Sequence, residues 1–411
     1  MAERDSRIDF GSGFLQAKYL RKYFDDFASE LGTMGYTHFT IQGYAGSIAH
    51  FGYWAQRKDL AIDDWSRDVV ADFARHRCRC PGTRRSERVS KKYSKRVKRF
   101  IIYLEQQKVI APVKRALEPA PSEFHDWLIQ HRGLCIRTVE HCEHELAKLL
   151  PTGGIDELEL TPKRVRTLVL DQAQCHSPNQ TRGMVSAFRA YLRFLASKGR
   201  CRPGLDKAIP TIPQWRLAAL PRYLPPQDVE RMIASCSSDT PVGVRDRAIL
   251  LLLARLGLRG GDIVKLRLDE INWKAATLKV CGKGRQEVCL PLPQDAGDAI
   301  LTYLQHGRSR ANVQQVFLCV QAPFRPLQSS GSVSYVVSAA LRRAGIVNPP
   351  TRGANLLRHS AATAMLRGGA SLDAVSSMLR HRSVDMTGHY AKVDIGMLEQ
   401  VVQPWPEGAP C

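Results

Sequence analysis

The chain has 411 residues, enough for two to four domains, and its 44% hydrophobic and 24% charged residues are typical of a folded globular protein. It carries 60 Lys and Arg against 39 Asp and Glu, which gives a formal net charge of +21. That excess is larger than solubility requires, so it favours a polyanionic partner and above all nucleic acid. A membrane surface, or positive charge that serves solubility alone, is the alternative.

The apolar runs of the sequence are short. The longest, Ala248 to Ala254, is far below the roughly 20 residues that cross a bilayer, and the N-terminal residues lack the apolar core of a signal peptide. The 11 cysteines are scattered and odd in number, unlike a disulfide framework. We therefore expect a protein of the reducing cytoplasm.

Two short segments combine cysteine with histidine. They contain His76, Cys78 and Cys80, and Cys135, His141, Cys142 and His144. Neither segment has the paired C-x2-C spacing of a structural zinc site, so we favour thiols without a metal and expect no metal in the protein. Metal binding is the less favoured alternative.

The N-terminal half repeats one helical pattern. Residues 36–110 contain three stretches with apolar residues at helical spacing, and residues 134–201 repeat them in the same order, with Thr40 corresponding to Thr138. This repetition predicts two small all-helical modules in tandem. A chance likeness between two sets of amphipathic helices is the alternative.

The stretch from Arg75 to Arg99 is strongly basic, with 12 Lys or Arg and one acid, Glu87. Such density predicts contacts to DNA phosphates rather than to bases. The candidate contacts are Arg84, Arg85, Lys91, Lys92, Lys95, Arg96 and Arg99. A solvated loop over residues 75–90 is the alternative.

Prolines crowd the segment from Pro203 to Pro226, which cannot form a continuous helix and therefore predicts a linker. We expect three domains. These are an N-terminal helical DNA-binding module with the basic loop at 1–115, a second helical module at 116–210, and a C-terminal domain with its tail at 211–411.

The C-terminal domain contains an almost wholly apolar helix that ends at Gly257. Arg259 follows the helix, and Asp262 is close enough in sequence to hold the guanidinium fork of this arginine; a surface arginine after a helix stop is the local alternative. Residues 277–292 then alternate around Lys283, which stands between two glycines. This pattern predicts a β-hairpin with a lysine at its tip, although such a turn is common.

Three motifs near the end of the chain form a specific pattern. They are Asn355-Leu356-Leu357-Arg358-His359, Leu379-Arg380-His381, and Tyr390, nine residues after the last histidine. In this order they resemble the tyrosine recombinase, or phage integrase, family, whose pattern is H-x-L-R-H, then L-G-H, then a tyrosine nine residues on. With Arg259 and Lys283 upstream, five of the six active-site positions match.

The resemblance implies a mainly helical protein with a small β-sheet, in which an α+β catalytic domain follows helical DNA-binding modules, the second similar to a core-binding module. It implies that Tyr390 attacks a DNA phosphodiester and forms a 3′-phosphotyrosyl bond, while Arg259, Arg358 and His381 stabilise the transition state. Lys283 would protonate the departing 5′ oxygen. No metal or other cofactor is implied.

One position departs from the family pattern. Asn355 stands where the family has a histidine that accepts or relays the tyrosine proton, and an amide cannot take up a proton near neutral pH. Water, Lys283 or His381 then handles that proton, or cleavage is slow, because loss of one auxiliary group costs a factor of about 10² to 10³. His359 is expected to pack or orient rather than to react.

The resemblance also implies partners. These are double-stranded DNA at specific recombination sites and a homo-tetramer, or a hetero-assembly with sister recombinases, at the nucleoid of a bacterium and not at a membrane. We expect integration, excision or transposition of a mobile element, and we expect Met397 to Val402 to dock on a neighbouring protomer. DNA relaxation by a type IB topoisomerase, or a DNA-binding accessory protein without catalysis, is the alternative.

Overall fold

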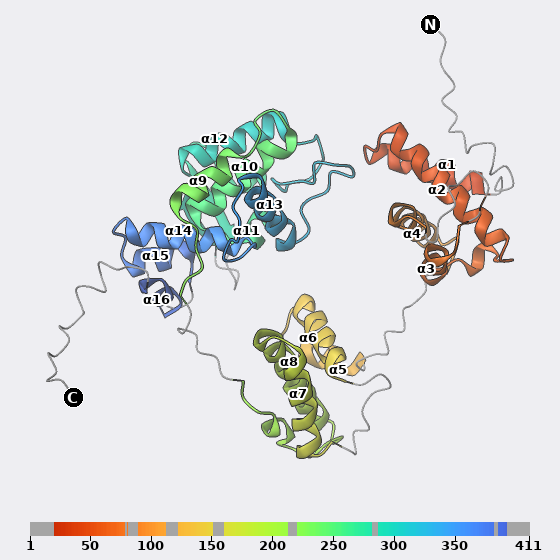
Figure 1. Ribbon diagram of the computed structural model, residues 1–411, viewed down its shortest axis with the longest axis horizontal. Coiled ribbons are helices and arrows are strands. Elements are labelled where there is room, and N and C mark those ends of the chain that lie inside the picture. Colours follow the sequence, from red (N-terminus) through yellow and green to blue (C-terminus); the bar gives the residue numbers. More distant parts are fainter. Residues whose placement is uncertain are drawn as a thin grey trace, which may run out of the picture. The chain divides into compact units, whose positions relative to one another are not determined.

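The protein is mainly helical with a small three-stranded β-sheet, as the resemblance implied (Figure 1). The computed structural model describes residues 20–78, 80, 89–111, 122–150, 160–212, 220–281, 287–381 and 385–392. Within these ranges, no helix has both the length and the apolar character that a membrane span needs. By its contacts the chain divides into one unit at Val113–Arg216 and another formed by Met1–Pro112 and Leu217–Cys411. The expected domain boundaries remain predictions, and each hydrophobic core is described by itself.

The first helical core is rich in aromatic side chains. Its helices are α1 (Arg21–Thr33), α2 (His38–Gln56), α3 (Arg67–Arg75) and α4 (Lys91–Gln106). The ring centroid of Phe27 on α1 lies 5.3 Å from that of Phe100 and 5.0 Å from that of Tyr103, both on α4. Ser66 fixes the start of α3, because its Oγ accepts a backbone hydrogen bond from the first turn.

The second helical core has the same order of helices. It contains α5 (Ser122–Gln130), α6 (Ile136–Leu149), α7 (Pro162–Cys175) and α8 (Pro178–Ser197). Ser177 and Gln180 cap the start of α8 reciprocally, and Pro178 lacks the N–H group that would otherwise need a partner there. The three helices predicted for each module are present, and α1 and α5 precede them as additions to the prediction.

The third core surrounds a long buried helix. Its elements are α9 (Pro226–Ala234), α10 (Pro241–Leu256), α11 (Gly260–Lys265), β1 (Ile271–Asn272), β2 (Thr277–Cys281), β3 (Glu287–Pro291), α12 (Gln294–Thr302), α13 (Ser330–Arg343) and the start of α14 (Asn355–Arg367). The rest of α14 forms a smaller, fourth core with α15 (Leu372–Leu379) and α16 (Asp385–Ala391). The buried helix is α10, which ends at Gly257 as predicted. Gly257 has a φ of +59°, which favours glycine, and a Cβ there would lie 2.5 Å from Cδ2 of Leu379, so the side chain of Leu379 would have to shift.

The sheet contains the predicted β-hairpin. Strands β2 and β3 are antiparallel, with Leu278 opposite Leu290 and Val280 opposite Val288. Strand β1 pairs with the other edge of β2. Lys283, at the predicted tip, lies outside the described residues.

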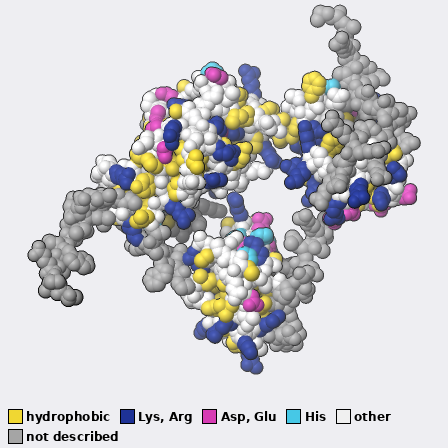
Figure 2. Space-filling view, viewed as in Figure 1, with side chains coloured by type: hydrophobic (Ala, Val, Ile, Leu, Met, Phe, Trp, Pro, Cys, Tyr) yellow, Lys and Arg dark blue, Asp and Glu magenta, His cyan; other side chains and the backbone are white. Residues whose placement is uncertain are grey.

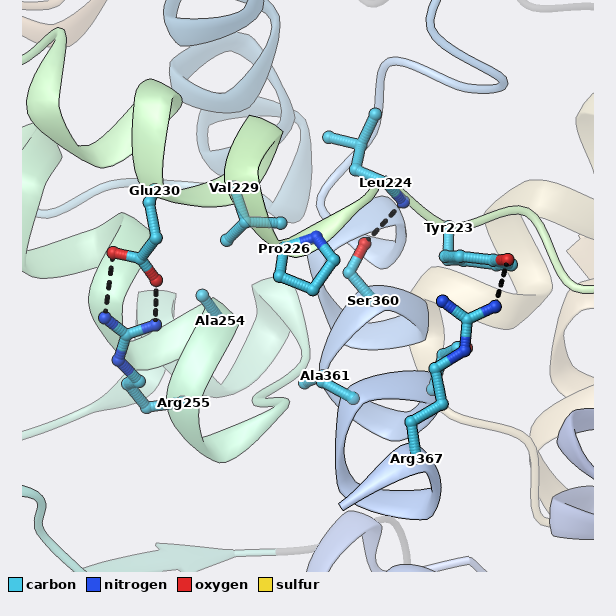
Figure 3. Close-up of a pocket in the computed structure, with 12 residues that line it drawn as sticks. Tyr223, Leu224, Pro226, Val229, Glu230, Ala254, Arg255, Ser360, Ala361 and Arg367 are labelled. Carbon is cyan, nitrogen blue, oxygen red and sulfur yellow. Dashed lines mark hydrogen bonds and ion pairs between the residues drawn. The ribbon is translucent and has the colours of Figure 1, made fainter. Parts of the chain in front are cut away.

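Helix α14 is fastened to the segment that precedes α9 (Figure 3). The N–H group of Leu224 donates to Oγ of Ser360 at 2.9 Å, and Arg367 donates to the hydroxyl of Tyr223 at 2.7 Å. These four residues line a pocket, and none of the expected catalytic residues that the structure describes is among its lining residues. The contacts fix α14 just after its arginine-histidine pair, and α14 packs in turn against α15 and α16 (Figure 1).

Candidate active site

Arg358 connects the ends of two helices. It projects from the first turn of α14 and is 5% exposed. Its Nη1 donates to the carbonyl oxygen of Gly257, at the end of α10, at 2.6 Å, and its Nη2 donates to the carbonyl oxygen of Leu379, at the end of α15, at 2.5 Å. Carbonyls at helix ends lack partners within the helix, so the guanidinium satisfies both and is rigidly held.

Arg259 begins α11 immediately after the buried helix. Its backbone N–H donates to Oδ2 of Asp262 at 2.8 Å, and its Nη2 donates to the carbonyl oxygen of Arg380 at 3.1 Å. Asp262 therefore fixes the backbone of Arg259. The expectation that this carboxylate holds the guanidinium fork of Arg259 is wrong, because its ion pair is formed with Arg380 instead.

Arg380 brings a third guanidinium to the site, and sequence reasoning missed it. Its Nη2 lies 2.5 Å from Oδ2 of Asp262, and its side chain is 6% exposed. Its Nε and Nη1 are buried and have no hydrogen-bond partner among the described residues. The signal was present in the sequence, because this position is the glycine of the family's L-G-H motif and Arg380 adopts the left-handed φ of +54° that favours glycine.

Tyr390 lies on α16 with its hydroxyl against a histidine. It is 3% exposed, and its hydroxyl oxygen lies 2.5 Å from Nδ1 of His359. An imidazole with an unprotonated Nδ1 accepts a hydrogen bond from the phenol hydroxyl in this arrangement. Burial raises the pKa of Tyr390, while the nearby Arg358 acts to lower it. The sequence predicted that His359 packs or orients, whereas in the structure its Nδ1 contacts the candidate nucleophile directly.

His381 also neighbours the ring of Tyr390. The two rings are nearly parallel, with an interplanar angle of 5° and centroids 6.3 Å apart. Nδ1 of His381 is 2.8 Å from Oγ1 of Thr387, which leaves Nε2 for another partner. Burial, with added repulsion from Arg358 and Arg259, lowers the pKa of His381 to about 4, so the ring is neutral at pH 7.

The three guanidiniums make the site strongly positive. Burial, reinforced by repulsion from Arg259, lowers the pKa of Arg358 to about 10. Burial also lowers the pKa of Arg259, and repulsion from Arg380 adds to the effect. Asp262 is the carboxylate paired with this cluster, so positive charge exceeds negative charge among the described residues. An anion bound here would relieve that repulsion. It would also accept hydrogen bonds from Nε and Nη1 of Arg380, which have no other partner among the described residues.

Asn355 is not joined to this cluster. Asn355 is the first residue of α14 and is exposed, and it makes no side-chain hydrogen bond with any described residue. The prediction for Lys283 falls outside the part of the chain that the structure describes.

The basic stretch divides into exposed and engaged residues. Of the candidate phosphate contacts, those exposed on α4 are Lys91, Lys92 and Lys95. Arg96 donates to the carbonyl oxygen of Gly43 at 2.6 Å, and Arg99 donates to the hydroxyl of Tyr36 and lies over its ring. Both arginines therefore hold α4 in its module. The remaining candidates, outside the described residues, are Arg84 and Arg85. Lys and Arg side chains are visible on the surface of each group of described residues (Figure 2).

A Gly257→Ala substitution is expected to damage the site. The left-handed φ costs about 1 to 2 kcal/mol for alanine, and the added Cβ must displace Leu379, whose carbonyl Arg358 binds. A shift of about 1 Å in a catalytic group can lower the rate about 10²-fold. Gly345→Ala is the matched control, because its φ is +65° but its Cβ would meet open space. Thermal unfolding and single-turnover DNA cleavage of both variants test this; equal cleavage by the two would contradict it.

The site defines a class of enzyme: a tyrosine hydroxyl beside a histidine and buried arginines suits covalent cleavage of a phosphodiester. Residues 222–396 match the model of the phage integrase family. A Sinorhizobium fredii (strain NBRC 101917 / NGR234) protein named as an integrase/recombinase, y4rA, is 31% identical over 395 residues, which cover 93% of this chain and 94% of the relative. The chain therefore belongs to the phage integrase family. It is a tyrosine recombinase, an enzyme of site-specific DNA recombination that cleaves and rejoins DNA strands.

Further comparisons agree with this assignment. Tyrosine recombinase XerD of Listeria innocua serovar 6a is 26% identical over 280 residues, which cover 66% of this chain and 93% of the relative. A solved lambda integrase tetramer bound to a Holliday junction shares the fold, with a TM-score of 0.52 at 15% identity, covering 75% of this chain and 88% of that one.

Proposed function

We propose that the cluster around Tyr390 binds the scissile phosphate and cleaves it with the tyrosine oxygen. The observation that carries this proposal is the contact between the Tyr390 hydroxyl and Nδ1 of His359, beside the buried guanidinium of Arg358. His359 accepts the phenol proton as the oxygen attacks phosphorus, and the bond to the 5′ oxygen breaks. The product is a 3′-phosphotyrosyl bond and a free 5′ hydroxyl.

The arginines and His381 stabilise the charge that develops on the phosphate. Arg259 and Arg380 are linked to each other through Asp262 and through the hydrogen bond from Arg259 to the Arg380 carbonyl oxygen. The open Nε and Nη1 groups of Arg380 are suited to non-bridging phosphate oxygens. His381 donates through Nε2. Lys283 completes the set in our proposal as the acid that protonates the departing 5′ oxygen, on the strength of its motif position alone.

The proposed substrate is double-stranded DNA at specific recombination sites, and the proposed outcome is integration, excision or transposition of a mobile element. The solved lambda integrase that shares this fold is a tetramer on a Holliday junction, which supports a tetramer here, either of this chain or with sister recombinases. The exposed lysines of α4 would bind phosphates outside the cleavage site. The relatives are bacterial, so the proposed location is the cytoplasm, at the nucleoid.

A two-step experiment tests this function. Random-sequence duplex DNA is selected for binding to the full chain, and the selected sequence is placed twice on one plasmid. Deletion or inversion between the two copies is expected, and a plasmid without the copies should stay unchanged. Relaxation of both plasmids without recombination would support the topoisomerase alternative instead.

An Arg380→Gly substitution is expected to slow cleavage about 10²-fold, the typical effect of removing one donor to a transition-state oxyanion. The backbone should tolerate the change, because glycine suits the left-handed φ of +54°. Arg367→Gln is the matched control, because this arginine lies on α14 and binds Tyr223 outside the site. Single-turnover cleavage of a nicked duplex is the measurement, and a wild-type rate for Arg380→Gly would show that the third guanidinium does not act on the phosphate.

A further inference from the structure

The first helical module brings together four side chains that suit a transition metal. They are His50, His76, Cys78 and Cys80, and their ligand atoms all lie within 4.8 Å of one another. His50 is on α2, 26 positions before the H-x-C-x-C segment that follows α3, so the sequence gave no reason to join it to that segment. The fold thus turns a three-residue motif into a four-residue cluster.

The spacing of these atoms is close to that of a tetrahedral zinc site. Sγ of Cys78 lies 3.4 Å from Nε2 of His50, and Sγ of Cys80 lies 3.8 Å from Nε2 of His76. Zinc bonds of about 2.3 Å to sulfur and about 2.1 Å to nitrogen place neighbouring ligand atoms about 3.4 to 3.8 Å apart. The cluster therefore needs only a small contraction to hold the ion.

The surroundings favour metal binding as well. Nδ1 of His76 donates to the carbonyl oxygen of Phe73 at 2.5 Å, which fixes the tautomer and directs the lone pair of Nε2 toward the cluster. The ring of Phe73 lies 5.0 Å, centroid to centroid, from each of His50 and His76. Cys78 and Cys80 are 3% and 8% exposed. The aromatic rings and the burial of both cysteines limit the access of water to the ligands.

We propose that His50, His76, Cys78 and Cys80 bind a structural zinc ion. Two imidazole nitrogens and two thiolates are the ligands that zinc prefers, and the set lacks the carboxylates that magnesium and calcium need. Binding releases the two thiol protons, and the two thiolates balance the charge of the ion. All four positions are protein ligands, so the ion has a structural and not a catalytic role.

The zinc ion would anchor the basic stretch that begins at Arg75. Its first residues would be tied to α2 through His50, and its last helix, α4, is already tied to α2 by Arg96 and its bond to Gly43. Both ends of the stretch would then be fixed on α2. This proposal concerns the module alone and stands whether or not the chain recombines DNA.

The test is the zinc content of the purified full chain, after incubation with zinc and removal of unbound metal. We expect about one zinc per chain, and its loss in a Cys78→Ser/Cys80→Ser double variant. A Cys135→Ser/Cys175→Ser variant, which removes two exposed thiols elsewhere, should keep the ion. A wild-type chain that retains no zinc, or a Cys78→Ser/Cys80→Ser chain that retains it fully, would overturn the proposal.

Two further measurements on the wild-type chain serve if the double variant does not fold. Cobalt(II) bound in place of zinc should give the intense visible bands of a tetrahedral ion with thiolate ligands, and an octahedral spectrum would overturn the assignment. Alkylation mapped by mass spectrometry should show Cys78 and Cys80 protected by zinc and exposed by a chelator. Equal alkylation in both states would mean that the thiols are not ligands.

Discussion

A Tyr390→Phe chain is expected to form no covalent adduct with a nicked suicide duplex that carries the selected site. The substitution removes the hydroxyl that lies 2.5 Å from Nδ1 of His359 and keeps the ring that packs among α14, α15 and α16. Loss of a nucleophile lowers turnover by at least about 10⁴-fold, so the adduct should fall below detection. Denaturing gels that resolve protein–DNA adducts provide the measurement, and DNA affinity should be unchanged.

The matched control is Tyr223→Phe. The hydroxyl of Tyr223 also contacts a side chain, that of Arg367, but Tyr223 lies at the pocket beside α9 rather than at the arginine cluster (Figure 3). This variant should form the adduct at the wild-type rate. An adduct that persists in Tyr390→Phe would place the nucleophile elsewhere, whereas the absence of any adduct in the wild-type chain would favour a DNA-binding accessory protein.

The order of the catalytic motifs and the main helices followed from the sequence because both depend on local patterns. The apolar run of α10 and its stop at Gly257 specify a buried helix with a left-handed end, and the alternation around Lys283 specifies the hairpin. The spacing from His381 to Tyr390 indicated the family, and the family resemblance predicted the mainly helical fold with a small sheet that the structure has. None of these steps required knowledge of which distant residues meet.

The partners of individual side chains could not be predicted, since they depend on tertiary packing. Asp262 is three positions from Arg259, yet its ion pair is with Arg380, on an element far along the chain. We predicted phosphate contacts for Arg96 and Arg99 because both are basic. Both instead lie on the face of α4 that points toward α2 and the turn before it. His50 joins the cysteines only through the packing of α2 against α3.

His359→Ala is expected to lower the single-turnover cleavage rate about 10²- to 10⁴-fold at pH 7, the usual effect of losing a general base. Its imidazole contacts the nucleophile in the way that the family's histidine, replaced here by Asn355, was expected to do. His389→Ala is the matched control, because this ring also neighbours Tyr390, with centroids 5.9 Å apart, yet His359 is the one that meets the hydroxyl. Asn355→His should not reduce the wild-type rate. Similar rates for His359→Ala and His389→Ala would remove His359 from the mechanism.

The pH dependence separates a base from a packing residue. Burial, with repulsion from His389 and Arg358, lowers the pKa of His359 below its ordinary value of 6.5. The neutral base therefore predominates at pH 7 and is lost as the pH falls through that lowered pKa. The wild-type rate should be flat above about pH 6.5.

The His359→Ala variant should behave differently. Burial raises the pKa of Tyr390, so tyrosinate is scarce without a base, and the His359→Ala rate should climb about tenfold per pH unit. Rates measured between about pH 5 and 9 decide the question. A flat profile for His359→Ala would mean that the proton leaves Tyr390 by another route, and the same variant carrying Asn355→His would show whether the family's usual position can restore it.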